Sequence, residues 1–152
     1  MVKQFSLLRT TLRAAGMALA ITVSLMGVAT AQANTQSEVN ATLRADPEIF
    51  NGLFVMGIAH GIRDICPTIE ARMIRANVLA LSLYNRARGM GFSRDEIRTF
   101  LRDDANKAEL RAIVIDYYNQ RGADIEQPET ICALGQAEIE AGTSAGALLR
   151  AR

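Results

Sequence analysis

The chain has one histidine, His60, and its position relative to an aspartate is the feature that most readily suggests acid–base chemistry. His60 precedes Asp64 by four residues, and in a helix this spacing places both side chains on the same face. A carboxylate can orient an imidazole for proton transfer or for metal binding. No motif supplies a nucleophile or a second histidine. We therefore expect a surface histidine tethered by Asp64, with no catalytic residue, no metal site and no cofactor; an enzyme using His60 and Asp64 is the least favoured alternative.

Two cysteines, Cys66 and Cys132, could form a disulfide, a redox pair or part of a metal site. A redox pair is usually arranged as Cys-x-x-Cys, and a metal site needs further ligands nearby. An even number of cysteines in a small exported domain is typical of a structural disulfide. We expect Cys66 and Cys132 to be bonded and to stabilise the fold by about 4 kcal/mol.

Gly57 and Gly61 lie one helical turn apart on either side of His60. A glycine inside a helix costs nearly 1 kcal/mol relative to alanine, so two of them indicate a close approach by another helix. We expect a helix-contact groove at Gly57, His60 and Gly61. Its simplest occupant is the chain's own helix near residues 69–87; a second copy of the chain or another protein is the alternative.

The elements that carry these residues are predicted to be helices throughout. A short helix is expected over residues 37–44, followed by one that begins at Asp46-Pro47-Glu48 and ends before Pro67. Thr68 is expected to cap the next helix, which would run to Gly89 or Gly91. Its apolar positions form a band so broad that we expect it to be buried on most sides as the central helix: Ile69, Met73, Ile74, Ala76, Val78, Ala80, Leu81, Leu83 and Ala87.

The second half of the chain has equally clear helix boundaries. Ser93-Arg94-Asp95-Glu96 is a capping box, and the helix after it would place Ile97, Phe100 and Leu101 inward. Asp103 or Asp104 starts the next helix, which ends near Gly122, and Pro128 starts a last helix that Gly142 ends. Thr143 or Ser144 would cap a final turn carrying Leu148 and Leu149. No window alternates with period two, so strands are not indicated. We expect an all-α fold: a compact bundle of about five to six short helices, stapled by one disulfide.

The first 33 residues read as a cleavable secretory signal peptide. Lys3, Arg9 and Arg13 precede an apolar run over residues 14–28, and small residues allow cleavage after Ala31 or Ala33. An uncleaved membrane anchor is the alternative, although the run is short for a spanning helix. We expect residues 34–152 to form a single helical domain in the periplasm, with membrane contact only in transit.

The charge balance narrows the classes of partner. The expected leader holds three of the 17 basic residues and none of the 16 acidic ones, so 14 basic and 16 acidic residues remain and the net charge changes from +1 to −2. A mildly acidic chain is a poor match for nucleic acid or for an anionic membrane surface. We therefore expect the partner to be another envelope protein or the chain itself.

Two segments of the sequence resemble a known family. They are Phe54-x-x-Gly57-x-x-x-Gly61-x-Arg63-x-x-Cys66-Pro67 and the ending from Cys132-Ala133-Leu134-Gly135 through Glu138-Ile139 and Gly142 to Leu148-Leu149-Arg150. Both are similar to domain-of-unknown-function family 5333, whose members are small exported alphaproteobacterial proteins. The resemblance covers nearly all of the mature chain and implies export and a single domain. It carries no assigned activity, so no catalytic residue follows from it.

Taken together, these features favour a non-enzymatic periplasmic binding or accessory protein that acts through protein–protein contacts. The alternative is a carrier of a small apolar ligand, with a pocket between helices lined by the Met73–Leu83 segment and Phe54.

Overall fold

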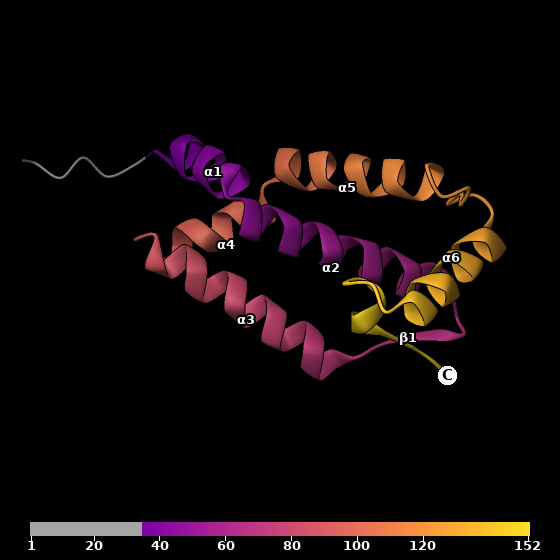
Figure 1. Ribbon diagram of the computed structural model, residues 1–152. Coiled ribbons are helices and arrows are strands. Elements are labelled where there is room, and N and C mark those ends of the chain that lie inside the picture. The colour runs from indigo at the N-terminus through magenta and orange to yellow at the C-terminus, as the bar shows by residue number, and fades with distance from the viewer. Residues whose placement is uncertain (1–34) are drawn as a thin grey trace, which may run out of the picture. The chain divides into compact units, whose positions relative to one another are not determined.

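The computed structural model describes residues 35–152 and contains six α-helices in that range (Figure 1). The predicted leader and its cleavage sites lie outside the described residues. The elements follow one another as α1 (Gln36–Ala45), α2 (Pro47–Ile65), β1 (Ile69–Ala71), α3 (Met73–Gly89), α4 (Arg94–Arg102), α5 (Asp104–Asn119), α6 (Pro128–Ala141), the 3₁₀ helix η1 (Gly146–Leu148) and β2 (Leu149–Ala151). The predicted all-α class and helix count are confirmed.

Local capping determines where several of these helices begin. Asp46 accepts hydrogen bonds from the backbone N–H groups of Glu48 and Ile49, and Pro47 occupies the first helical position of α2. Ser93 forms the predicted capping box with Glu96 at the start of α4. These side chains satisfy N–H groups that a helix leaves without partners in its first turn.

Helix α2 is the central helix, and α1, α3, α5 and α6 all pack against it (Figure 1). The prediction that the helix near residues 69–87 is central and buried on most sides is therefore wrong. Only Leu83 and Ala87 of α3 are buried, and both lie in its C-terminal half. Helices α2 and α3 are both apolar enough to be central, but only one helix can occupy the middle of a small bundle. Here α2 does so, and α3 keeps one face in solvent.

A short two-stranded antiparallel sheet, β1 with β2, corrects the prediction that the chain has no strands. Ile69 pairs with Ala151, and Ala71 pairs with Leu149. Residues 69–71 are extended instead of helical, so α3 begins at Met73 and Thr68 does not cap it. Strands of three residues are too short to show period-two alternation, which explains why the sequence pattern did not reveal them.

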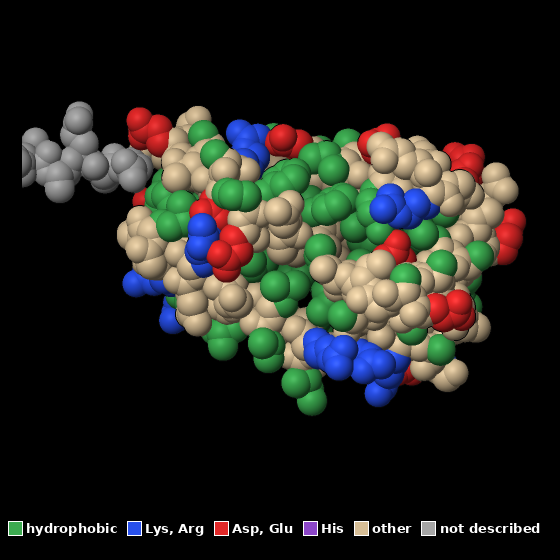
Figure 2. All heavy atoms as spheres, viewed as in Figure 1, with side chains coloured by type: hydrophobic (Ala, Val, Ile, Leu, Met, Phe, Trp, Pro, Cys, Tyr) green, Lys and Arg blue, Asp and Glu red, His purple; other side chains and the backbone are tan. Residues whose placement is uncertain are grey.

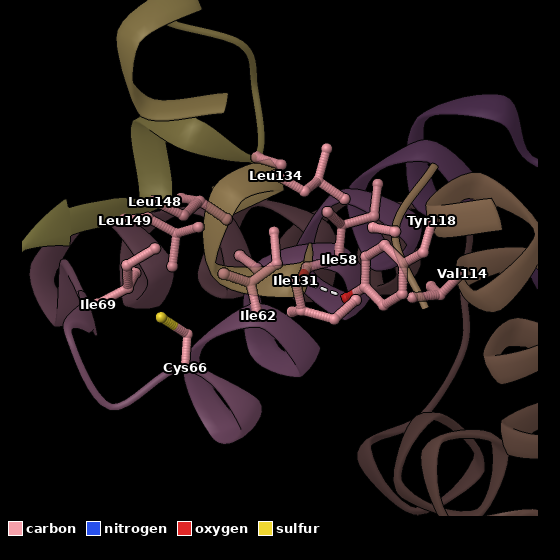
Figure 3. Close-up of a cluster of buried hydrophobic side chains, with 13 residues drawn as sticks. Ile58, Ile62, Cys66, Ile69, Val114, Tyr118, Ile131, Leu134, Leu148 and Leu149 are labelled. Atoms are coloured by element: carbon pink, nitrogen blue, oxygen red, sulfur yellow. Dashed lines mark hydrogen bonds between the residues drawn. The ribbon is translucent and has the colours of Figure 1, made fainter. Parts of the chain in front are cut away.

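The buried side chains form two clusters. The larger one joins α2, α5, α6 and the chain ending around Ile58, Ile62, Tyr118 and Ile131 (Figure 3). The smaller one joins α1, α2, α3 and α4: Val39, Leu43, Ile49, Ala87, Phe92, Ile97 and Phe100. Leu101, predicted to face inward, is 51% exposed.

The predicted disulfide is present between Cys66 and Cys132, whose Cα atoms are 5.1 Å apart. Cys66 is the C-cap of α2, and Cys132 lies in the first half of α6. The bond therefore fixes the end of the central helix to α6, beside the large cluster.

Candidate functional site

His60 and Asp64 lie together on the exposed surface of α2. Nδ1 of His60 is 3.2 Å from Oδ2 of Asp64, and the two side chains are 64% and 48% exposed. Arg63 contacts both: its Nε donates to Oδ1 of Asp64 at 2.9 Å, and its Nη2 lies 2.9 Å from the same histidine nitrogen. No group of three or more histidine, cysteine or acidic residues that could hold a metal occurs among residues 35–152. The three side chains form a solvated ion network.

The groove at Gly57 and Gly61 is filled by α5 and not by the helix after Cys66. A Cβ on Gly57 would lie 3.0 Å from Cγ2 of Val114, and one on Gly61 would overlap the hydroxyl of Tyr118. That hydroxyl donates to the backbone oxygen of Ile58 at 2.8 Å (Figure 3). The glycines thus serve packing within the chain, while His60 points outward from the same helix.

Helix α3 exposes four large apolar side chains, which we call the α3 stripe: Met73, Ile74, Val78 and Leu81. They are 56%, 82%, 65% and 58% exposed, respectively. Ile74, Val78 and Leu81 follow the i, i+4, i+7 spacing, so they share one face of the helix. In Figure 2, apolar side chains protrude along the outer edge of α3. Large exposed apolar patches often mark interaction sites, so this face of α3 is a candidate interaction surface.

A basic hollow of about 450 Å³ adjoins the N-terminal end of the stripe. We call it the arginine hollow; Met73 and Ile74 line it together with Ala71, Arg72, Arg75 and Arg150. Basic side chains lie beside the protruding apolar ones in Figure 2. The stripe and the hollow therefore form one continuous surface.

A second hollow, of about 400 Å³, lies between α2 and α3. Its lining is mostly apolar and includes Met56 from α2 and Ala76 and Ala80 from α3, with His60 and Arg63 on its rim. Phe54, predicted to line such a pocket, instead packs edge-to-face on Tyr117, with ring centroids 5.5 Å apart. Leu83 is likewise not part of this lining.

Glu138 was named only as part of the family resemblance and not as a candidate site residue, yet among residues 35–152 it is the charged residue that is buried, only 4% exposed. The hydroxyls of Tyr117 and Thr143 donate to its two carboxylate oxygens, and Nε of Arg121 lies 3.7 Å from one of them. Arg121 also lies over the Tyr117 ring, 3.5 Å from its centroid. Burial, together with the hydrogen bond to Glu138, raises the pKa of Tyr117 to about 12. The cluster joins α5 to α6. The hydroxyl groups and the guanidinium provide the buried carboxylate of Glu138 with the hydrogen bonds and the opposite charge that a buried charge requires.

Among residues 35–152, no helix is long and apolar enough to cross a membrane.

Comparison with protein families gives a match over residues 41–150 to a family described as a family of unknown function (DUF5333). No curated protein and no solved structure matches the chain.

Proposed function

The chain belongs to DUF5333, a family of unknown function, and on that premise we propose that it is an exported, non-enzymatic protein that binds another envelope protein through the α3 stripe. The observation that carries the proposal is the exposure of Ile74, Val78 and Leu81 in register on one helix face. Burying apolar area stabilises an interface by roughly 25 cal/mol per Å². Side chains of this size, covered by a partner, would each contribute on the order of 1 kcal/mol.

Export is supported by the disulfide, because structural disulfides persist in oxidising compartments such as the periplasm. The leader expected from the sequence gives the same location. The intact mass of the protein purified from the periplasmic fraction tests this: a chain beginning at Gln32 or Asn34 supports export with cleavage, and recovery of the protein only from the cytoplasmic fraction contradicts export.

A non-enzymatic role is supported by the surroundings of His60. Its imidazole is largely exposed and lies beside the Arg63 guanidinium, with no nucleophilic side chain among its contacts in the described part of the chain. If the protein is an enzyme that uses this pair, His60→Ala abolishes the phenotype that depends on the protein; an unchanged phenotype supports the binding role.

Binding through the stripe is tested by placing a charge in its middle. Val78 is 65% exposed, so Val78→Asp leaves the fold intact and removes complexes seen after crosslinking in envelope extracts. The matched control is Leu101→Asp, which introduces the same charge at an exposed apolar position on α4. Thermal melts of both variants should match the parent. Loss of complexes in both variants, or in neither, contradicts the proposal.

A second candidate is a carrier of a small apolar ligand, and the hollow between α2 and α3 is the observation in its favour. Its volume of about 400 Å³ falls within the range of ligand pockets. Ala76→Phe would fill it from the α3 side. If the protein is a carrier, native mass spectrometry detects a bound small molecule in the parent and none in this variant; its absence in both removes the carrier role.

A further inference from the structure

The charge around the α3 stripe is uneven, and it is concentrated in the arginine hollow. Nε of Arg72 donates to the backbone oxygen of Leu149 at 2.8 Å, and Nη1 of Arg75 donates to that of Ala147 at 3.1 Å. Neither guanidinium has a carboxylate within 4 Å in the described part of the chain, 35–152. Backbone carbonyls thus hold the two side chains in place without neutralising them.

Other features of the N-terminal end of α3, beside the arginine hollow, add to the positive potential there. The helix contains no acidic residue, and no side chain caps its first N–H groups. The positive end of the helix dipole therefore adds to the charge of the arginines. Arg150 shares a single carboxylate, Glu70, with Arg152, each at 2.8 Å.

The opposite end of α3 lacks this excess. Arg86 lies 2.7 Å from Asp46 and 2.6 Å from Glu48. Arg88, whose Nη1 donates to the backbone oxygen of Phe92 at 2.6 Å, has no carboxylate within 4 Å among residues 35–152, but, after the hydrogen bonds with Ser93, its charge contributes to lowering the pKa of Glu96. The negative end of the helix dipole also offsets the arginines here. The stripe therefore runs from a strongly basic end toward a less basic one, over about 10 Å between Ile74 and Leu81 at 1.5 Å per residue. A partner that matches both features has apolar side chains along two helical turns and acidic side chains at one end only.

The geometry favours a helix as the matching segment. The stripe is a ridge of side chains spaced i, i+4 and i+7, and such ridges pack into the grooves between side chains of another helix. An anionic lipid surface is a poorer match, because residues 34–152 carry a net charge of −2 and because Trp and Tyr are the side chains enriched at membrane interfaces. The stripe contains no aromatic residue.

A second copy of the chain fits the charge less well. In a parallel pair, the arginine hollows of the two copies would lie together without a carboxylate from α3, because the helix has none. In an antiparallel pair, the carboxylates that would approach the hollow are Asp46 and Glu48, and both are already bound to Arg86. A partner with complementary charge compensates for a small apolar area by faster association.

On the basis of the proposed function, we infer that the α3 stripe binds an amphipathic helix of another protein. This helix presents apolar residues over two turns and carries aspartate or glutamate at the end that lies against the arginine hollow. The charge complementarity determines the direction in which the partner helix lies along α3.

The partner segment is identified by crosslinking from inside the stripe. A photo-crosslinking amino acid replaces Val78 in the exported protein, and the crosslinked peptide is sequenced by mass spectrometry. The same amino acid at Asp95, an exposed position on α4, is the control. The expected adduct is a helical segment with apolar residues spaced i, i+4, i+7 and acidic residues at one end.

A synthetic peptide of that segment should bind the parent chain at least tenfold more tightly than it binds the Arg75→Glu variant at low ionic strength, and this difference should shrink at 0.5 M salt. Arg98→Glu on α4 should bind as the parent does.

The outcomes separate this inference from the function on which it depends. An adduct with a protein segment that lacks acidic residues overturns the inference and leaves the protein-binding function standing. An adduct with a second copy of the chain or with lipid overturns the inference and also the proposal that the partner is another envelope protein. If Val78 gives no more protein adduct than Asp95 does, both the inference and the proposed function fail.

Discussion

Gly61 shows how one missing side chain permits a buried hydrogen bond. Because Gly61 has no Cβ, the Tyr118 hydroxyl can reach the backbone oxygen of Ile58 at 2.8 Å. Tyr118 is one of the largest fully buried side chains of the described chain. Its hydroxyl would be costly to bury without this partner.

Gly61→Ala should lower the free energy of unfolding by about 2 kcal/mol, because the new methyl group displaces the Tyr118 hydroxyl and leaves it buried without its acceptor. Urea unfolding measures the change. Gly89→Ala is the control, since its added Cβ would meet no other part of the described chain within 4 Å beyond its neighbours in the helix; its stability should be unchanged or higher by up to about 1 kcal/mol. Equal effects at both positions would show that helix propensity and not the Tyr118 contact is responsible.

Tyr117 should make stability depend on alkaline pH. Burial and the hydrogen bond to Glu138 raise its pKa to about 12, whereas an unfolded tyrosine titrates near 10. The folded state therefore favours the neutral phenol, and its contribution is complete below pH 10 and lost as the pH rises toward 12. Tyr117→Phe should show a smaller loss of unfolding free energy between pH 9 and pH 11.5 in urea titrations. Burial raises the pKa of Tyr118 too, so some loss remains. An identical loss in parent and variant would contradict the assignment to Tyr117.

At the scale of the helix, Asp46 links the start of α2 to the end of α3. It caps α2, and its oxygens accept from Nε and Nη2 of Arg86, both at 2.7 Å. The bond to Arg86 is the largest cause that lowers its pKa to about 2, followed by the backbone N–H of Ile49.

Because folding lowers the pKa of Asp46, its contribution is present above the ordinary value of 3.8 and is lost as the pH falls toward 2. Asp46→Asn keeps the cap but removes the charge. The variant should be less stable than the parent at pH 7 and should lose less stability between pH 4.5 and pH 2.5, as measured by urea unfolding at each pH. Asp95→Asn removes an exposed ion pair with Arg98 and should behave as the parent does. Parallel pH profiles for the parent and Asp46→Asn would contradict the prediction.

The capping residues explain why helix starts could be predicted and the role of α3 could not. Asp46, Ser93 and Pro128 act within a few residues of their own position, so their pattern is visible in the sequence. Whether Ile74 or Val78 is buried depends on which other helix covers it. Two apolar segments compete for the centre, and the pattern of either is compatible with burial.

The same reasoning applies to the candidate surface. The sequence placed Met73, Ile74, Val78 and Leu81 in the core, and the structure exposes them. The cluster at Glu138 was missed because its partners come from residues 117, 121 and 143, and only the packing of α5 against α6 brings them together. His60 and Asp64 were placed together from the sequence because four residues in one helix fix their separation.

For the molecule as a whole, the disulfide joins α2 and α6, two of the elements that form the large cluster. The cysteines are separated by 66 positions, so the bond closes most of the described chain into a loop. In the chain-entropy model, a crosslink of that span stabilises the folded state by about 4 kcal/mol. Small domains have a total stability of only about 5–15 kcal/mol. Oxidation thus supplies a large part of the stability that keeps the stripe and the arginine hollow in place.

Replacing both cysteines, Cys66→Ala with Cys132→Ala, should therefore lower the free energy of unfolding by about 4 kcal/mol, and reduction of the parent should lower it by a similar amount. Urea unfolding of oxidised and reduced protein measures both. The double variant, which has no cysteine left to reduce, is the control: its unfolding curve should be the same in the presence and in the absence of the reductant. Cys66 is fully buried, so a void adds to the loss in the variant, which should exceed the loss on reduction slightly. If reduction leaves the stability unchanged, α2 and α6 are held together by packing alone, and the disulfide would no longer support the proposal that the protein is located in an oxidising compartment.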